Sequence, residues 1–139
     1  MMKIEWDESY VVGVELFDEH HKKLLGLINE LHSAIGLGED KAKLEYFLSS
    51  FLDYAFYHFA LEEHFMKEVS YADYESHKKE HDRFVSKIHD FHSVLKDGSP
   101  DILKGLSEYI LNWWNDHILV TDKKYTSFFK GKTICFTFS

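Results

Sequence analysis

Seven side chains of types that commonly bind metal ions stand in the 139-residue sequence at spacings that a helical bundle would turn inward. They fall on four separate stretches with strong helical character. The seven are His21, His58, Glu62, His77, His81, His117 and Asp122. Five imidazoles and two carboxylates are the number and kind of donors that can hold two iron ions and leave one coordination position open. The set therefore predicts a non-haem metal centre.

Helical spacing supports two pairs within this set. Residues four apart lie on the same face of a helix, one turn above the other. This is the spacing of His58 and Glu62, and also of His77 and His81. Each pair continues the apolar series of its own stretch, and a polar group that points into a core is destabilising unless it is paired or ligated. Both pairs are therefore expected to bind metal from inside the bundle.

A second match to the same spacing, His64 with Glu68, is expected to face solvent. At roughly 100° per residue, His64 lies about 120° from the direction of His58 on a helix. Its neighbours on that face include Glu63 and Lys67. Three further histidines flank the apolar series and are expected at the surface or partly buried: His32, His89 and His92.

The remaining candidates depend more on their surroundings. Only one of two adjacent residues can face inward, and His21 rather than His20 continues the apolar series of the first stretch. His117 and Asp122 are five apart, which separates them by about 140° on a regular helix. A π-type turn or a lean across the bundle would be needed for both to reach one site. Taken alone, this last pair favours a structural role.

Apolar residues recur at the helical period along four segments. The expected helices cover about 18–36, 39–67, 71–96 and 99–129. Asp18 and Ser99 are expected to cap the first and the last of them. The inward series of the last helix is expected to include Ile110, Trp113 and Val120. Because short connections between long helices favour antiparallel neighbours, the sequence predicts an all-α, up-down-up-down four-helix bundle.

One domain is expected over residues 1–130, in which 1–17 form an N-terminal arm. The short tail, 131–139, alternates with period two and predicts either an extended segment over the bundle or disorder. A hydrophobic content of 45% is enough to fill a core for a chain of this length.

Composition excludes several classes of protein. A net charge of −8 argues against nucleic acid as a partner, since phosphate binding needs a cationic face. The single cysteine, Cys135, excludes an internal disulfide and fits a reducing compartment. No run approaches 18 apolar residues, so no membrane span is expected. The acidic segment Met1–Tyr10 is unlike a signal peptide, and a cytoplasmic protein is therefore predicted.

Four motifs resemble those of the hemerythrin family, and most closely its single-domain bacterial form. They are Asp18–Leu24, His58–Glu63, His77–His81 and His117–Asp122. The resemblance spans residues 6–129 and fills all seven ligand positions of the family with the expected residue type. Two positions depart from the usual pattern of the family. His20 replaces a glutamine and adds an imidazole that could substitute for His21 as a ligand, and Ala72 stands where a proline is frequent.

The resemblance implies how the ligands would divide between two iron ions. Three histidines would bind one ion: His77, His81 and His117. Two would bind the other, which would keep a free position: His21 and His58. Two carboxylates would bridge the Fe²⁺ or Fe³⁺ pair together with an oxo or hydroxo group: Glu62 and Asp122.

The function implied by the resemblance is reversible dioxygen binding, for storage, transport or delivery to an oxygen-consuming enzyme. Four residues beside the ligands would line an apolar oxygen pocket, although ordinary core packing also explains them: Leu24, Phe59, Trp113 and Ile118. A monomer that is not itself an enzyme is expected. The alternatives are a di-iron redox enzyme of the peroxidase or nitric oxide reductase type, and an oxygen or redox sensor. The redox enzyme is less favoured because oxygen-activating bundles carry more carboxylates. The sensor is less favoured because sensors usually carry a fused output domain.

Overall fold

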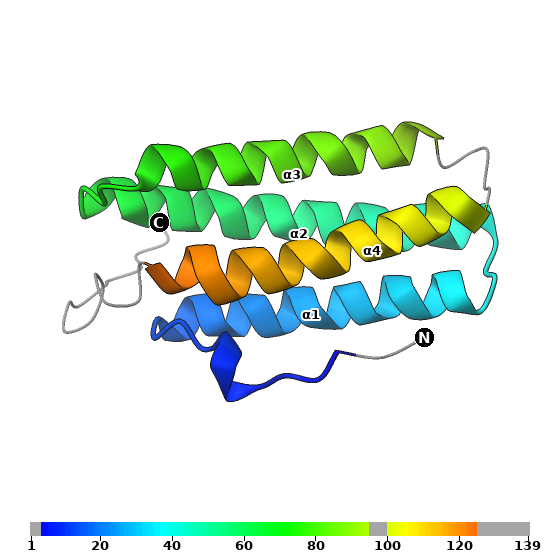
Figure 1. The fold of residues 1–139 in the computed structure, drawn as a ribbon, viewed down its shortest axis with the longest axis horizontal. Helices are drawn as coiled ribbons and strands as arrows, with labels where there is room; N and C mark the ends of the chain where they lie inside the picture. Colours follow the sequence, from blue (N-terminus) through cyan, green and yellow to red (C-terminus); the bar gives the residue numbers. More distant parts are fainter. Residues whose placement is uncertain (1–3, 95–99, 125–139) are drawn as a thin grey trace.

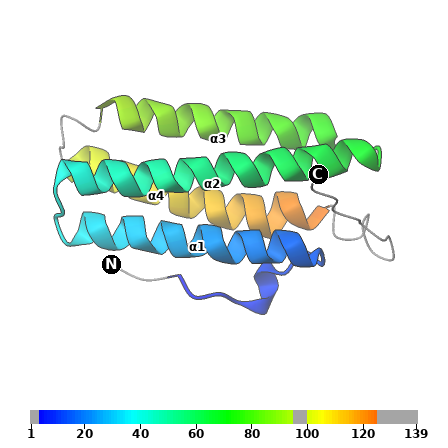
Figure 2. The ribbon, with the colours of Figure 1, turned by 180° about the vertical axis from the view of Figure 1, so that it is seen from behind.

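The protein folds into a bundle of four long antiparallel helices (Figures 1 and 2). The computed structural model describes residues 4–94 and 100–124. The helices are α1 (Glu15–Gly36), α2 (Lys41–Glu68), α3 (Tyr74–Val94) and α4 (Pro100–Asp116). A six-residue π-helix, η3 (His117–Asp122), continues α4. The predicted all-α up-down-up-down bundle is thus confirmed. The predicted tail over 131–139, Cys135 and the Ser99 cap lie outside the described residues.

The core lies between the inner faces of all four helices. Each helix contributes a pair of fully buried residues one turn apart: Leu24 and Ile28, Leu48 and Phe51, Phe84 and Ile88, and Ile110 and Trp114. The rings of Phe51 and Phe84 meet edge to face, with centroids 5.7 Å apart. Burying a side chain of this size stabilises the fold by about 1.5–3 kcal/mol. Apolar burial therefore holds the four helices that carry the candidate ligands.

The predicted start of α2 is close to the observed one, whereas the predicted start of α1 is wrong. Asp40 caps α2, since its carboxylate accepts a hydrogen bond from the backbone N–H of Lys43 at 2.9 Å. The predicted cap at Asp18 is wrong, because α1 begins at Glu15. The Asp18 carboxylate instead accepts from the backbone N–H of Val12 at 2.8 Å. This bond satisfies the backbone donor of the buried Val12 and fixes the arm to the first turn of α1.

Two helix ends share one turn type. After α1, Gly38 has φ +68°, its N–H bonds to the carbonyl of Ile35, and the N–H of Glu39 bonds to the carbonyl of Ala34. After α2, Ser70 has φ +54°, and the N–H of Tyr71 bonds back to Met66. Both are Schellman motifs, which place one residue in the left-handed region. The second motif makes α3 begin at Tyr74 rather than at residue 71.

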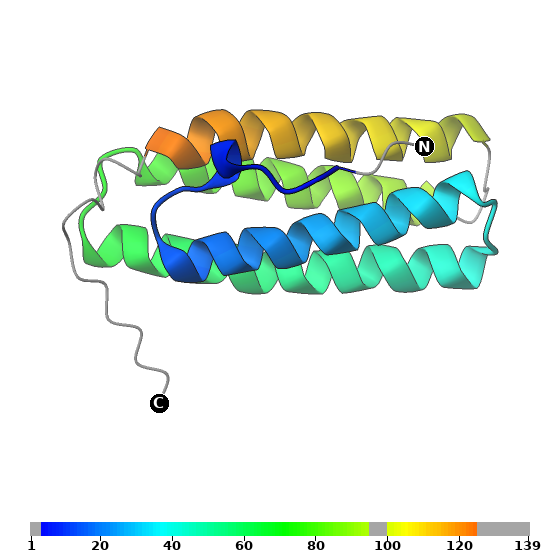
Figure 3. The same ribbon diagram turned by 90° about the horizontal axis from the view of Figure 1, so that it is seen from below.

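The N-terminal arm lies along the bundle next to α1 and α4 (Figure 3). Asn29 of α1 holds it by two hydrogen bonds, because its side-chain oxygen accepts from the N–H of Ile4 and its amide donates to the carbonyl of Ile4, each at 2.9 Å. Further along, Tyr10 of the 3₁₀ turn η1 (Glu8–Tyr10) packs edge-on against Trp114, with centroids 5.3 Å apart. The arm therefore covers the seam between the first and last helices.

Three predicted burials on these helices are corrected by the structure. Val120 is 57% exposed, because the wider turn of η3 moves the inward face to Thr121 and Asp122. Trp114, not Trp113, is the fully buried tryptophan. His32, expected at or near the surface, is only 6% exposed. Over the residues described, none of the helices has the length and apolar character to cross a membrane.

Candidate metal centre

All seven predicted ligands point into one buried region between the four helices. They come from α1, α2, α3 and the π-helix η3 that continues α4, and every one is at most 1% exposed. α1 supplies His21, α2 supplies His58 and Glu62, and α3 supplies His77 and His81. The π-helix η3 supplies the last two, His117 and Asp122. The structure thus brings the whole predicted set together.

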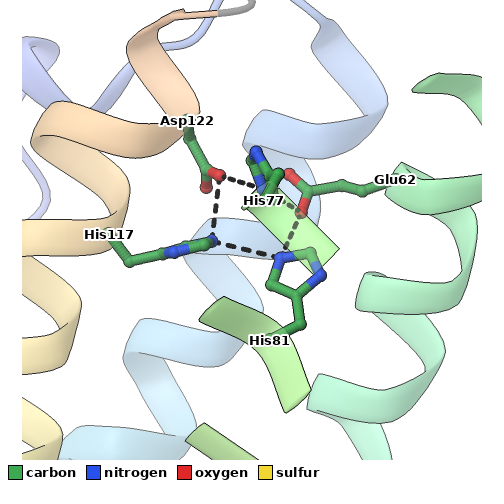
Figure 4. A group of neighbouring side chains, drawn as sticks. All are labelled: Glu62, His77, His81, His117 and Asp122. Carbon is green, nitrogen blue, oxygen red and sulfur yellow. Dashed lines mark hydrogen bonds and ion pairs between the residues drawn. The ribbon is translucent and has the colours of Figure 1, made fainter. Parts of the chain in front are cut away.

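Five of these residues form the first ligand group, drawn in Figure 4. Oδ1 of Asp122 lies 3.0 Å from Nε2 of His77 and 3.0 Å from Nε2 of His117. Oε1 of Glu62 lies 3.2 Å from Nε2 of His81. The donor atoms of the group are all within 4.8 Å of one another. Three imidazole nitrogens and two carboxylate oxygens therefore converge on a space of the size that one metal ion needs.

The second ligand group shares both carboxylates with the first. Nε2 of His21 lies 2.9 Å from Nε2 of His58 and 3.2 Å from Oδ2 of Asp122. Nε2 of His58 lies 3.3 Å from Oε2 of Glu62. Each carboxylate therefore turns one oxygen toward the three histidines and the other toward the two. The two ligand groups are therefore joined by Glu62 and Asp122.

The carboxylates of this region favour the charged form. Burial raises the pKa of Glu62, but the charge of His58 and the hydrogen bonds of the surrounding histidines lower it well below its ordinary value. Burial and the charge of Glu62 raise the pKa of Asp122, but the charge and hydrogen bond of His117 lower it well below its ordinary value. Two anionic groups are thus held in the protein interior, where a cation is the natural counter-charge.

The histidines respond to the same two carboxylates. Burial lowers the pKa of His77, but hydrogen bonds to Asp122 and Glu62 outweigh it and raise the pKa to about 10. Burial also lowers the pKa of His117, and the charge of Asp122 raises it to about 9. For His58 burial dominates and lowers the pKa to about 4. Without metal, the three-histidine group therefore holds protons that a metal ion would have to displace.

Three polar neighbours of the ligands were not predicted from the sequence as part of the site. Nδ1 of His81 is hydrogen-bonded to Oε2 of Glu63 at 2.8 Å, and Nδ1 of His117 faces Oε1 of Glu80 at 3.4 Å. Nδ1 of His58 is 2.9 Å from Nδ1 of His20. Each neighbour precedes or follows a candidate ligand in the chain, and only that adjacency could have pointed to them.

Sequence expectations about the remaining histidines have a mixed outcome. His64 and Glu68 form an exposed pair 3.9 Å apart, with side chains 61% and 64% accessible, so the predicted solvent-facing role is confirmed. His20 belongs to neither ligand group. It contacts His58 from the side remote from the carboxylates instead of substituting for His21.

The predicted pocket residues lie around the centre in two sets. Phe59 stacks on His81, with ring centroids 3.8 Å apart, and Trp113 stacks on His117 at 4.9 Å. Leu24 and Ile118 are fully buried on α1 and η3. Trp114, which was not predicted as a pocket residue, lies edge-on to His21, with ring centroids 6.3 Å apart. Apolar and aromatic groups therefore surround both ligand groups.

Comparison with known proteins shows which family carries this arrangement. Residues 12–128 match the hemerythrin HHE cation binding domain. The chain belongs to the hemerythrin family. Its relatives include the bacteriohemerythrin of Methylococcus capsulatus (strain Bath), 30% identical over 90% of this chain and 95% of that protein. The bacteriohemerythrin of Pseudomonas aeruginosa is also 30% identical, over 90% of this chain and 80% of the relative.

Solved hemerythrin structures agree with the family assignment. Wild-type hemerythrin superimposes with a TM-score of 0.79 at 27% identity, covering 91% of this chain and 97% of the other.

A further relative by sequence is a hemerythrin-like protein of Naegleria gruberi, which is 34% identical over 86% of this chain and 88% of its own length. The matched region of this hemerythrin-family chain contains all seven candidate ligands, and their donor set fits a metal centre.

Proposed function

We propose that this chain binds dioxygen reversibly at a non-haem di-iron centre and acts as a carrier rather than as an enzyme. The observation that carries the proposal is the unequal division of five imidazoles around two shared carboxylates. Three imidazoles serve one ion position and two serve the other. With two carboxylate oxygens and one bridging oxygen from solvent, the first ion would have six ligands and the second five. A small diatomic molecule could bind at the position left open.

The donor set favours iron over other common metals. Imidazole and carboxylate suit iron, and tetrahedral structural zinc would use four ligands rather than seven. Fe²⁺ ions held here would supply the electrons needed to bind dioxygen and would regain them on its release. The family to which the chain belongs supports the same choice of metal.

The residues around the ligands would keep the site dry and its imidazoles fixed. Leu24 and Ile118 are fully buried, and Trp114 lies against His21 of the two-histidine group. Excluding water limits proton transfer to bound oxygen, which would otherwise leave the irons oxidised. Phe59 and Trp113 stack on ligand imidazoles and restrict their rotation. These contacts favour a site that releases its ligand unchanged.

Carriage is preferred over oxygen activation because of the charge of the ligand set. The two ligand groups contain only two carboxylates, Glu62 and Asp122, among seven candidate ligands. A ligand set that contains few anions stabilises high-valent iron poorly. Oxygen-activating di-iron bundles contain more carboxylate ligands. The same reasoning leaves transport, storage and delivery to an oxygen-consuming enzyme as uses of one binding activity.

The test is iron analysis combined with visible spectroscopy of the purified protein. Two irons per chain are expected, with an iron charge-transfer band that disappears on oxygen removal and returns on exposure to air through repeated cycles. Conversion to a stable oxidised form at the first exposure, with turnover of peroxide or nitric oxide, would instead indicate a redox enzyme. His64→Ala, an exposed change outside both ligand groups, provides the control and should cycle as the unchanged protein does.

A further inference from the structure

We propose that His20 is a positioning residue for the candidate ligand His58, to which it presents a neutral hydrogen-bond acceptor. In the three-histidine group, His81 and His117 have carboxylates in the equivalent place. The two halves of the centre would therefore differ in their outer hydrogen bonds as well as in the number of histidines. The inference rests on the metal centre of the proposed function but concerns a residue outside the ligand set.

Both ring nitrogens of His58 are engaged. Its Nε2 faces the centre, 2.9 Å from Nε2 of His21 and 3.3 Å from Oε2 of Glu62. Its Nδ1 lies 2.9 Å from Nδ1 of His20, within a buried environment. His20 itself is only 4% exposed. The contact is therefore a hydrogen bond between two buried imidazoles, shielded from competition by solvent.

Metal binding would fix the direction of this hydrogen bond. When Nε2 of an imidazole holds a metal ion, its proton resides on Nδ1, and that N–H donates to a neighbouring acceptor. Nδ1 of His20 must then accept, and the proton of His20 resides on its own Nε2. A neutral His20 fulfils this role with one tautomer, and that tautomer orients the ring of His58 toward the carboxylates.

The ring of His20 is itself held by aromatic packing. Tyr54 meets it edge to face at 5.8 Å, and Tyr57 lies tilted against it at 5.3 Å. Phe17 contacts both His20, at 6.4 Å, and His58, at 5.7 Å. These contacts restrict rotation of the His20 ring, so its acceptor nitrogen stays directed at His58.

The outer partners in the other ligand group are anionic. Glu63 accepts from Nδ1 of His81 at 2.8 Å, and Glu80 accepts from Nδ1 of His117 at 3.4 Å. Glu80 also accepts from the hydroxyl of Thr121 at 2.8 Å. Carboxylate acceptors make an imidazole a stronger donor to metal than a neutral acceptor does.

The remaining histidine of the two-histidine group strengthens this difference. Nδ1 of His21 is buried and has no hydrogen-bond partner among the residues described. His20 is therefore the one outer hydrogen-bond acceptor that the described residues give to that group. Weaker electron donation from this group would favour the reduced state of an iron ion held there.

Substitutions of His20 separate its effects on position and on charge. His20→Phe keeps the ring volume but removes the acceptor, and we expect about 10- to 100-fold weaker binding of metal at the two-histidine position. His20→Gln restores a neutral acceptor and should recover most of that loss. His20→Glu places an anion there and should lower the reduction potential of the iron centre. His32→Phe, a change of another buried histidine of α1, is the matched control and should alter neither quantity.

Competition with a chelator measures the metal affinity of each variant. Anaerobic redox titration measures the reduction potential of the iron centre. The inference is overturned if His20→Phe binds metal as the unchanged protein does, or if His20→Gln is as damaging as His20→Phe. It is also overturned if His20→Glu leaves the potential unchanged. None of these readouts requires dioxygen, so a protein that binds iron but fails to cycle would refute the proposed function without affecting this test.

Nuclear magnetic resonance of the zinc-loaded unchanged protein provides a test without substitutions. We expect a proton on Nδ1 of His58, a proton on Nε2 of His20, and a scalar coupling across the N–H···N bond between the two Nδ1 atoms. A proton on Nδ1 of His20, or the absence of that coupling, would contradict the proposed role.

Discussion

Nε2 of His117 and Oδ1 of Asp122 lie 3.0 Å apart although the residues are five positions apart in the chain. They contact each other because they are the first and last residues of the π-helix η3. A π-helix closes its hydrogen bonds over five residues instead of four, so it accommodates one extra residue per turn. The pair therefore occupies the same relative position that residues four apart have on an α-helix.

Deletion of Val120 tests this interpretation of the π-helix. The shortened chain would place the carboxylate four residues after His117, about 40° away on a regular α-helix. Because Val120 is 57% exposed, its loss removes little of the core. We expect the deletion variant to keep two metal ions per chain by metal analysis, whereas Asp122→Ala should lose them. If both variants lost their metal ions to the same extent, the π-helix would have a role beyond orienting the side chain of Asp122.

Glu62 and His64 offer a direct test of which helix face carries the ligands. Glu62→Ala removes an oxygen from both ligand groups, so we expect its iron content to fall from two ions per chain to less than one. His64→Ala changes an exposed side chain two residues away and should retain two ions. Iron analysis after purification under identical conditions measures both. Retention of two ions in Glu62→Ala would refute the shared-carboxylate arrangement.

Protons and metal should compete at the three-histidine group. The pKa values of His77 and His117, about 10 and about 9, exceed the ordinary value of 6.5, so both are protonated in the folded, metal-free protein at pH 7. Binding must release two protons, and the apparent zinc affinity should rise up to about 100-fold per pH unit between pH 7 and 9. Titration against a competing chelator measures the slope. A flat profile would contradict the protonated state.

The same pKa values predict how the stability of the metal-free protein depends on pH. A histidine whose folded pKa is raised stabilises the fold fully below its unfolded pKa and loses that contribution as the pH rises through its folded pKa. The contribution of His77 and His117 should therefore be complete below about pH 6.5, decline steadily above it, and be lost by about pH 9 for His117 and about pH 10 for His77. Thermal unfolding followed by circular dichroism should show the melting temperature falling between about pH 6.5 and pH 10.

Ser70 is a site where a single substitution should stabilise the protein. Its φ of +54° lies in the left-handed region, which costs a non-glycine residue about 1–2 kcal/mol. Ser70→Gly should therefore increase the free energy of unfolding by about 1 kcal/mol in urea denaturation. Ser49→Gly, the same change within helix α2, should decrease it by about 0.5 kcal/mol. Effects of the same sign in both variants would contradict the role assigned to the turn.

Much of the bundle could be predicted because its signals are local. The helical period of the apolar residues fixed which face of α2 points inward, and with it the burial of Glu62 and the exposure of His64. Asp40 precedes α2 as a residue that caps well, and it does cap it. These features depend on residues within one or two turns of each other, which a sequence displays directly.

The features that could not be predicted depend on contacts between segments. Asp18 has the chemistry of a helix cap, but the arm uses its carboxylate through Val12. His20 lies outside the inward face of α1, yet it is buried because α2 brings His58 and two tyrosines against it. Trp114 was missed for a similar reason, since Tyr10 of the arm covers it. Such burial arises from neighbours that are distant in the chain.

The spread of the candidate ligands from α1 to η3 has a consequence for chain connectivity. An ion bound by both His21 and Asp122 would close a loop that includes most of the sequence, in the manner of a cross-link between the first helix and the last. Closing long loops removes conformational freedom chiefly from the unfolded chain. Metal loading and folding would then be one linked equilibrium, and loss of the ions would loosen all four helices together instead of vacating a preformed cavity.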